Sequence, residues 1–271
     1  MATDTFLDAC RLGQALAGEL IIDAHAHMGP WHNFHVPHNS ARGMVERLDQ
    51  LGIDACVASP HAAIGPCHLQ GNRQVMAAED EFPGRIIPYV TINPNYPEAE
   101  IRAEIEHWHG LGRIRAFKIH PALHNYRVNG PGYGPMFEYA REHSLPVLSH
   151  SWAGDSLGGA SLLSRLAAEM PSVTFLVGHA ASSWDMIEEA CREAQARDNV
   201  ILDLTGSQLL YLALEAMVER AGAEKIVFGS DIPFIDAAPG LGRILAARLP
   251  DDAKRRVLGL NAQRIFRLPG R

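Results

Sequence analysis

Short apolar runs alternate with amphipathic stretches from one end of the chain to the other. Apolar runs of about four to eight residues, bounded by Gly, Pro or Asn, indicate buried strands, and apolar residues spaced by three and four indicate helices. Eight strands are predicted, at residues 20–27, 55–60, 86–92, 116–120, 146–151, 174–180, 200–206 and 226–232. The helices predicted between them cover residues 40–52, 72–82, 97–110, 134–144, 161–170, 183–198 and 207–222, and a closing pair lies within 241–267.

The ends of several predicted helices carry their own signals. We expect Ser40, Ser161 and Ser183 to cap helix N-termini, because a serine hydroxyl accepts a hydrogen bond from a free N–H of the first turn. Gly52, Gly110 and Gly222 are expected near helix C-termini, where the backbone often turns left-handed.

Eight strands that alternate with eight helices in about 250 residues predict a (β/α)₈ barrel, also called a TIM barrel. We expect one α/β domain that spans residues 1–271. A doubly wound open sheet would show the same alternation of strands and helices. That fold would need a glycine-rich phosphate-binding turn after its first strand, and the segment AHAHMGPWHN (24–33) lacks a GxGxxG pattern. The barrel is therefore the predicted fold.

The composition is that of a globular protein, with 47% hydrophobic and 20% charged residues. A net charge of −7 argues against nucleic acid or an anionic membrane surface as the main partner. The four cysteines are far apart and form no CxxC pair, which is typical of reduced thiols in a cytoplasmic protein. We expect a cytoplasmic protein that acts on a small molecule, and the sequence leaves open whether it forms a homo-oligomer.

Histidine is unusually frequent, with 14 histidines against three lysines. His25 and His27 end the first predicted strand, in IIDAHAHMGP (21–30). Successive side chains alternate across a strand, so Asp23, His25 and His27 are expected to point to one side and the intervening apolar residues to the other. Two imidazoles about 7 Å apart on one face are well placed to bind a single cation.

Further polar residues fall at the ends of later predicted strands: Lys118 and His120, His150, His179 and Asp231. The carboxyl ends of all strands of a barrel open onto one face, so these side chains are expected to gather there. Burying so many polar groups requires hydrogen bonds or a metal ion. Histidines with one carboxylate suit Zn²⁺ or a similar ion, so we expect a zinc site at the C-terminal end of the strands, with manganese as the alternative.

The segments IIDAHAHMG, FKIHP, VLSHS, FLVGHA, FGSDIP and VLGLNAQRIFRL together resemble the amidohydrolase superfamily. Within it they are similar to the amidohydrolase 2 family of small metal-dependent hydrolases and decarboxylases. The resemblance runs from residue 21 to residue 268 and implies a barrel with one or two divalent metals at its mouth. The metal ligands that it implies are His25, His27, Lys118, His150, His179 and Asp231.

The role of Lys118 stays open between alternatives. Parity places Lys118 and His120 on the inner side of their strand, whereas Phe117 and Ile119 face the helices. The resemblance to binuclear members implies a lysine carboxylated by CO₂ that bridges two metals. An unmodified ammonium would instead bind an anionic group of the substrate, or pair with a carboxylate for structural reasons alone.

The expected activity is hydrolysis of a small amide, lactone or ester. A bound metal lowers the pKa of its water toward about 7. Asp231 is expected to accept the proton of that water and pass it to the leaving group. His179, where it is not a ligand, would polarise the carbonyl. Substrate contacts are expected from His120, Trp31 and Trp152.

Two other functions remain open at this point. The same branch of the superfamily performs non-oxidative decarboxylation of aromatic or vinylic carboxylates, in which Asp231 or His179 would protonate the carbon. The lysine of the fourth strand favours the hydrolase. A barrel that only stores metal would also contain histidines, but it would not need Asp231 opposite them.

Overall fold

The computed structural model describes residues 5–16, 18–206 and 208–270. All of the strand pairs in this part of the chain are parallel. One sheet has the order β1-β2-β3 and the other runs from β4 to β9 in chain order. The strands are β1 (Ile22–Met28), β2 (Ala55–Pro60), β3 (Ile86–Pro88), β4 (Val90–Thr91), β5 (Phe117–Ile119), β6 (Val147–Ser149), β7 (Phe175–Val177), β8 (Val200–Asp203) and β9 (Ile226–Val227).

Hydrogen bonds join both pairs of sheet edges, so the two sheets form one barrel. Tyr89 separates β3 from β4 within the predicted strand 86–92, and its N–H donates to the carbonyl of Ala58 in β2 (2.9 Å). On the opposite side, the N–H of Ala24 in β1 donates to the carbonyl of Phe228, directly after β9 (2.8 Å). With β3 and β4 counted as one strand, this is the predicted (β/α)₈ barrel. Strand β2 has its predicted bounds, β1 begins two residues later and ends one residue later than predicted, and the other strands are shorter than predicted.

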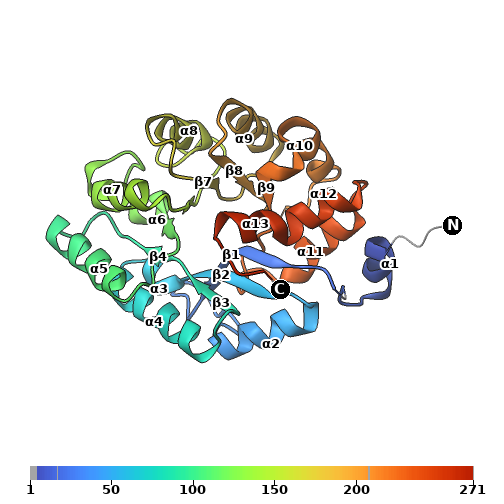
Figure 1. Cartoon of the computed structure of the whole chain (residues 1–271), viewed down its shortest axis with the longest axis horizontal. Coiled ribbons are helices and arrows are strands. Elements are labelled where there is room, and N and C mark those ends of the chain that lie inside the picture. The colour runs from blue at the N-terminus through green and yellow to red at the C-terminus, as the bar shows by residue number, and fades with distance from the viewer. Residues whose placement is uncertain (1–4, 17, 207, 271) are drawn as a thin grey trace.

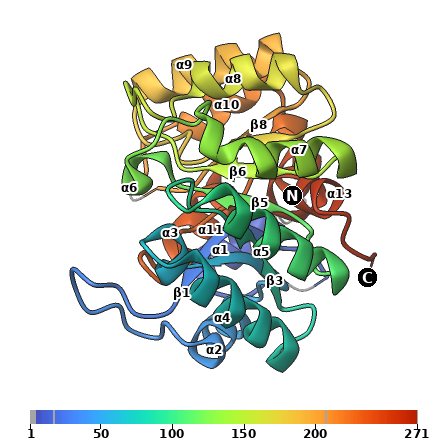
Figure 2. The same ribbon diagram turned by 90° about the vertical axis from the view of Figure 1, so that its left-hand side faces the viewer.

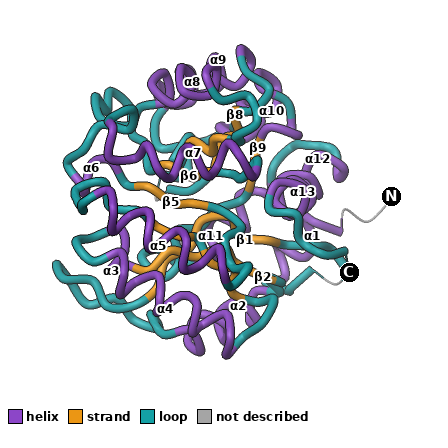
Figure 3. Tube along the Cα trace, turned by 60° about the vertical axis from the view of Figure 1, so that its left-hand side comes forward, coloured by secondary structure: helices purple, strands orange, loops and turns teal. Residues whose placement is uncertain are grey.

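Helices surround the strands (Figures 1 and 3). They are α1 (Thr5–Leu12), α2 (Ala41–Leu51), α3 (His61–Ile64), α4 (His68–Glu81), α5 (Glu98–Gly110), α6 (Pro121–His124), α7 (Gly134–His143), α8 (Ala160–Glu169), α9 (Trp184–Ala196), α10 (Ala213–Ala221), α11 (Ala237–Ala246), α12 (Asp251–Arg255) and α13 (Asn261–Ile265). Short 3₁₀ turns η1 (Pro131–Tyr133) and η2 (Ala223–Lys225) and the π-helical stretch η3 (Arg256–Leu260) complete the set. None of the described helices is long and apolar enough to cross a lipid bilayer.

Two of the three predicted serine caps are confirmed. Ser40 Oγ accepts a hydrogen bond from the N–H of Gly43, and Ser183 Oγ accepts one from the N–H of Met186 (both 3.1 Å). The prediction for Ser161 is wrong, because α8 begins one residue earlier and Gly159 is its N-cap. The Ser161 hydroxyl instead donates to Glu189.

Helix α10 is shorter than its predicted range of 207–222. It begins only at Ala213, because Leu212 takes a left-handed backbone conformation (φ 58°) that interrupts the helix. Ser207, the first residue of the predicted range, lies outside the described residues. The segment 208–212 is therefore part of the loop at the mouth of the barrel.

The apolar core has an inner and an outer part. Ile22 and Ala24 of β1 belong to the inner cluster, together with inward-facing residues of the other strands and Phe266 beneath them. Ala26 and Met28, later in β1, belong to the outer cluster between strands and helices. The register of β1 against β2 shifts between Asp23 and Ala26, so the side-chain alternation changes phase.

The prediction that Asp23 shares one side with His25 and His27 is therefore wrong. The carboxylate of Asp23 instead accepts hydrogen bonds from the N–H and hydroxyl of Ser230, beyond β9. It also accepts one from the N–H of His25 (3.0 Å). Asp23 thus connects β1 to the segment after β9 while the two histidines face the barrel axis.

Candidate metal centre

The ends of β1, β7 and β9 bring His25, His179 and Asp231 together. One nitrogen or oxygen from each of these side chains lies within 4.8 Å of the others. His179 and Asp231 both have left-handed backbone (φ 57° and 72°). This conformation is costly for residues other than glycine, and such residues concentrate at functional sites. Three strand ends therefore place two imidazoles and one carboxylate around one point.

The orientation of His25 is set from the far side of its ring. Its Nδ1 donates to Asp203 Oδ2 at 2.6 Å, and both side chains are fully buried. The hydrogen on Nδ1 leaves a lone pair on Nε2, which lies 3.7 Å from Asp231 Oδ1. A carboxylate behind a metal-binding histidine fixes its tautomer in this way.

His27 has the same tautomer for a different reason. Its Nδ1 donates to the backbone carbonyl of Ser59 at 3.0 Å, so Nε2 carries a lone pair. That lone pair faces Asp231 Oδ1 at 3.2 Å. A nitrogen lone pair and a carboxylate oxygen at this distance in a buried site require a cation or a proton between them. The donor set around Asp231 therefore fits a divalent metal.

Burial alone would raise the pKa of the Asp231 carboxyl, but contacts with His27 and His179 outweigh it and hold that pKa well below its usual range. Burial lowers the pKa of His179 to about 3, although Asp231 acts in the opposite direction. Burial raises the pKa of Asp203, opposed first by His179. These shifts favour the neutral imidazole of His179 and the carboxylate of Asp231, which are the protonation states that metal binding needs.

Lys118 lies in this centre and is fully buried. Its Nζ is 2.6 Å from His25 Nε2, the same lone pair that faces Asp231. Burial lowers the pKa of Lys118 to about 8, against the attraction of the Asp231 and Asp203 charges. The predicted inward orientation of Lys118 is confirmed, with Phe117 and Ile119 in the outer core.

His150 and His120 form a stacked pair beside the centre, with ring centroids 3.9 Å apart. His150 also meets His179 edge to face at 4.5 Å. His120 Nδ1 accepts from the N–H of Leu123 (3.2 Å) and so caps α6. Trp152 is 43% exposed and lies 5.5 Å from His179, centroid to centroid. This side of the mouth is therefore built from flat rings.

A second aromatic group lies on the opposite side, against His27. The ring of His61 is 5.5 Å from that of His27 and 4.0 Å from that of Phe234. Trp31 packs edge-on against both His61 (5.5 Å) and Phe234 (5.3 Å). Of the residues predicted to bind substrate, Trp31 and Trp152 thus lie on different sides of the candidate ligands.

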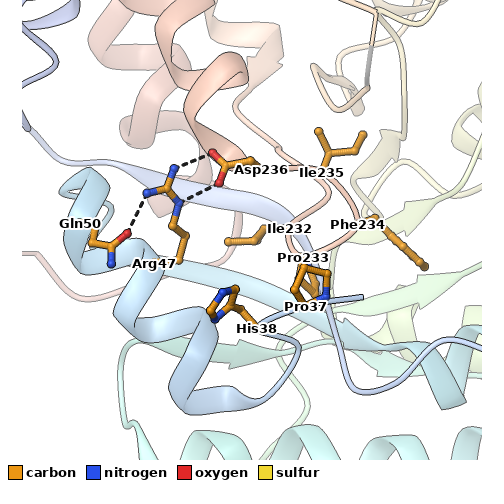
Figure 4. Close-up of a pocket in the computed structure, with 9 residues that line it drawn as sticks. All are labelled: Pro37, His38, Arg47, Gln50, Ile232, Pro233, Phe234, Ile235 and Asp236. Carbon is orange, nitrogen blue, oxygen red and sulfur yellow. Dashed lines mark hydrogen bonds and ion pairs between the residues drawn. The ribbon is translucent and has the colours of Figure 1, made fainter. Parts of the chain in front are cut away.

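The segment that follows Asp231 also lines a pocket of about 420 Å³ on the outside of the centre. Figure 4 shows Arg47 of α2 reaching Asp236 there through two hydrogen bonds, each 2.8 Å long. The loop between β1 and α2, which carries Trp31, projects from the body of the protein in Figure 2. The Arg47–Asp236 pair therefore ties the Asp231 segment to the helix that follows this loop.

Asp203, Ser59 and His61 take part in this arrangement but were not among the residues predicted to form the site. Asp203 lies in the middle of the predicted strand 200–206, so a search of predicted strand ends misses it, whereas β8 ends at Asp203 in the structure. His61 follows β2 directly and belongs to a His-rich stretch. Ser59 places both its backbone carbonyl and its hydroxyl oxygen 3.0 Å from His27 Nδ1.

A family model described as Amidohydrolase matches residues 22–268, which is nearly the whole chain. The chain belongs to this amidohydrolase family. The match confirms the resemblance that the strand-end motifs carry. A comparison with curated protein sequences finds no match.

Solved structures share the fold of this amidohydrolase at low sequence identity. A 5-carboxyvanillate decarboxylase, LigW from Sphingomonas paucimobilis, is 16% identical with a TM-score of 0.69, over 93% of this chain and 100% of that one. The 5-carboxyvanillate decarboxylase of Novosphingobium aromaticivorans, complexed with manganese, is 14% identical with a TM-score of 0.73, over 93% and 97%. The 4-oxalomesaconate hydratase LigJ from Rhodopseudomonas palustris is 14% identical with a TM-score of 0.67, over 92% and 96%.

Proposed function

We propose that this amidohydrolase is a metal-dependent decarboxylase that removes CO₂ from a planar aromatic or vinylic carboxylate without oxidation. The observation that carries this proposal is the contact between Lys118 Nζ and His25 Nε2 at 2.6 Å. A metal bound to the Nε2 lone pair of His25 would end this contact, and the buried ammonium would then need an anionic partner. We therefore assign one metal to the centre and an unmodified Lys118 that pairs with the substrate carboxylate.

The residues that would hold the metal are His25, His27, His179 and Asp231, and His150 is the candidate for a further ligand. A divalent ion, zinc or manganese, would supply Lewis-acid polarisation of the substrate's oxygen atoms. Asp203 and Ser59 keep the Nε2 lone pairs of His25 and His27 directed inward.

The carboxylate of Asp231 can transfer the proton that replaces the carboxyl group on the substrate carbon. Asp231 is ionised, so it takes a proton from solvent or from a hydroxyl of the substrate and gives it to the carbon that bears the carboxylate. The bond from this carbon to the carboxyl group then breaks, its electron pair returns to the carbon skeleton, and CO₂ leaves. The flat rings of Trp31, Phe234 and Trp152 are the walls against which a planar substrate would pack.

The structural neighbours support decarboxylation over the hydrolysis expected from the sequence, since two of those compared are decarboxylases of an aromatic carboxylate. The family match supports hydrolysis as the second candidate. Decarboxylation and hydrolysis differ in one measurable product, which is CO₂. Protein loaded with Mn²⁺ or Zn²⁺ is incubated with 5-carboxyvanillate and a panel of hydroxylated benzoates and vinylic carboxylates, and CO₂ release is measured.

A matching panel of lactones, esters and amides is assayed for acid release. We expect CO₂ from at least one carboxylate, lost after chelation of the metal and in Asp231→Asn. Hydrolysis of a lactone, ester or amide without CO₂ release from any carboxylate would contradict the proposal.

A further inference from the structure

A separate pocket of about 360 Å³ lies between the segment that leads into α10 and helix α11 with the residues that follow it. Its walls are mainly apolar, with Leu210, Leu212 and Leu214 on one side and Pro239 on the other. Arg243 of α11 also lines it. The pocket contains none of the candidate metal-binding residues, so it is distinct from the centre described above.

The protein provides hydrogen-bond acceptors for only part of the Arg243 guanidinium. One nitrogen, Nη2, donates to the carbonyl of Leu204 at 2.7 Å. Its Nε and Nη1 are buried and have no hydrogen-bond partner among the described residues. A guanidinium is always charged and offers five N–H donors, so leaving two of its nitrogens buried without an acceptor is unfavourable.

The nearest interacting carboxylate does not supply the missing bonds. The charge of Asp203 acts on Arg243, but its oxygens are already engaged. Oδ2 accepts from His25, and Oδ1 accepts from the backbone N–H and hydroxyl of Thr205. No described residue therefore supplies the acceptor that these two nitrogens lack.

The residues that line the pocket indicate the charge and the polarity of the molecule that would carry the acceptor. Its charged lining residues are Arg243, Arg248 and Glu215, two cations against one anion, which leaves a net charge of +1. Leu209 and Tyr211 at its rim are 46% and 74% exposed, so apolar surface there remains uncovered. A single negative charge complements the guanidinium, and an apolar body complements the walls.

We propose that this pocket binds a monocarboxylate with an apolar chain or ring, whose carboxylate pairs with Arg243 and whose apolar part lies against the leucine-rich segment 209–214. Inorganic phosphate would leave the walls uncovered, and an uncharged apolar molecule would leave the arginine unpaired. The site is independent of the proposed decarboxylation and of the metal.

Calorimetric titration of the full chain with octanoate tests this site, with acetate and octan-1-ol as probes that lack the chain or the charge. We expect octanoate to bind at one site per chain, with acetate and octan-1-ol each about 10-fold weaker or more. Arg243→Gln should weaken octanoate about 10- to 100-fold. Arg192→Gln is the control, because Arg192 is 67% exposed and does not line the pocket, and it should leave the affinity unchanged.

The titration is repeated after the metal is removed by chelation. Unchanged octanoate binding supports the pocket, whereas loss of binding would assign the carboxylate to the metal centre and overturn the proposal. Equal octanoate affinity in the wild type and Arg243→Gln would also overturn it. If Arg243→Gln does not fold, Leu209→Glu places a carboxylate at the exposed rim instead, and undiminished octanoate binding by that variant counts against the site.

Discussion

His25 and Asp203 are joined by a hydrogen bond of 2.6 Å across 178 positions of the sequence. The bond connects the middle of β1 to the end of β8 inside the barrel, where neither side chain is exposed. Asp203 therefore does for His25 what the Ser59 carbonyl does for His27, which is to place the proton on Nδ1 and leave Nε2 for a cation.

Asp203→Asn is expected to weaken metal binding about 10- to 100-fold, since the neutral amide no longer favours the Nδ1–H tautomer of His25. Titration of the metal-free protein with Zn²⁺ and Mn²⁺ measures this effect. Asp198→Asn is the control, because Asp198 is fully exposed on the outer surface. Equal affinity in Asp203→Asn and the wild type would show that Asp203 does not position His25.

Gly229→Ala is expected to disrupt the hydrogen bond between His25 and Asp203 through a steric clash. A Cβ at Gly229 would lie 2.1 Å from Asp203 Oδ1 and 2.9 Å from the Cβ of His25, so both must move. We expect lower stability and weaker metal binding, measured by urea unfolding and metal titration. Gly134→Ala serves as the control, because no atom lies within 4 Å of the added methyl group there. Metal affinity unchanged in Gly229→Ala would contradict this interpretation.

Asp231→Asn is expected to lower turnover by about 10²- to 10⁴-fold, because the amide cannot carry the proton that the ionised carboxylate carries. Metal content should fall much less, since the amide oxygen still offers a ligand atom. Steady-state kinetics and metal analysis on the same preparation separate the two effects. Turnover at the wild-type rate would remove Asp231 from the mechanism.

Lys118→Met is expected to leave the metal content at one equivalent per chain and to raise KM for a carboxylate substrate about 10-fold or more. Elemental analysis of metal-loaded protein and steady-state kinetics measure the two quantities. Lys225→Met is the control, because Lys225 bonds surface carbonyls of Arg197 and Asp198 far from the site. Two equivalents in the wild type that drop to one in Lys118→Met would establish the carbamate bridge instead.

Stability is expected to fall as the pH decreases from about 6.5 toward 4, partly through His68. Burial, and secondly the nearby His124, lower the pKa of His68 to about 4 in the folded protein. In the unfolded chain this pKa is about 6.5, so the unfolded state binds more protons across this range. The stabilising contribution is complete above pH 6.5 and is lost as the pH falls through the window.

His68→Phe should therefore lose less stability between pH 7 and pH 5 than the wild type, by up to about 1.4 kcal/mol per pH unit. Urea unfolding at the two pH values measures the difference. The exposed His107 provides the control variant, His107→Phe, which should follow the wild type. Parallel losses in the wild type and His68→Phe would contradict the assignment.

The positions of the strands, the barrel fold and most of the residues at its mouth could be predicted from the sequence. The buried strands consist of short apolar runs. Because all strands of such a barrel are parallel, their carboxyl ends lie on one face, and this can be predicted without knowledge of packing. That reasoning predicted that His25, His27, Lys118, His179 and Asp231 gather at the mouth, and the structure places each of them next to at least one of the others.

Only the tertiary structure decided how those residues are oriented and connected. The register shift in β1 reverses the side-chain alternation after Asp23, and a shift of this kind depends on the neighbouring strands rather than on local sequence. The bond between His25 and Asp203 and the unpaired nitrogens of Arg243 depend on segments far apart in the chain. Periodicity records which residues are buried, but hydrogen bonds and charges in a closed barrel depend on which strands and helices meet, and that is set by packing.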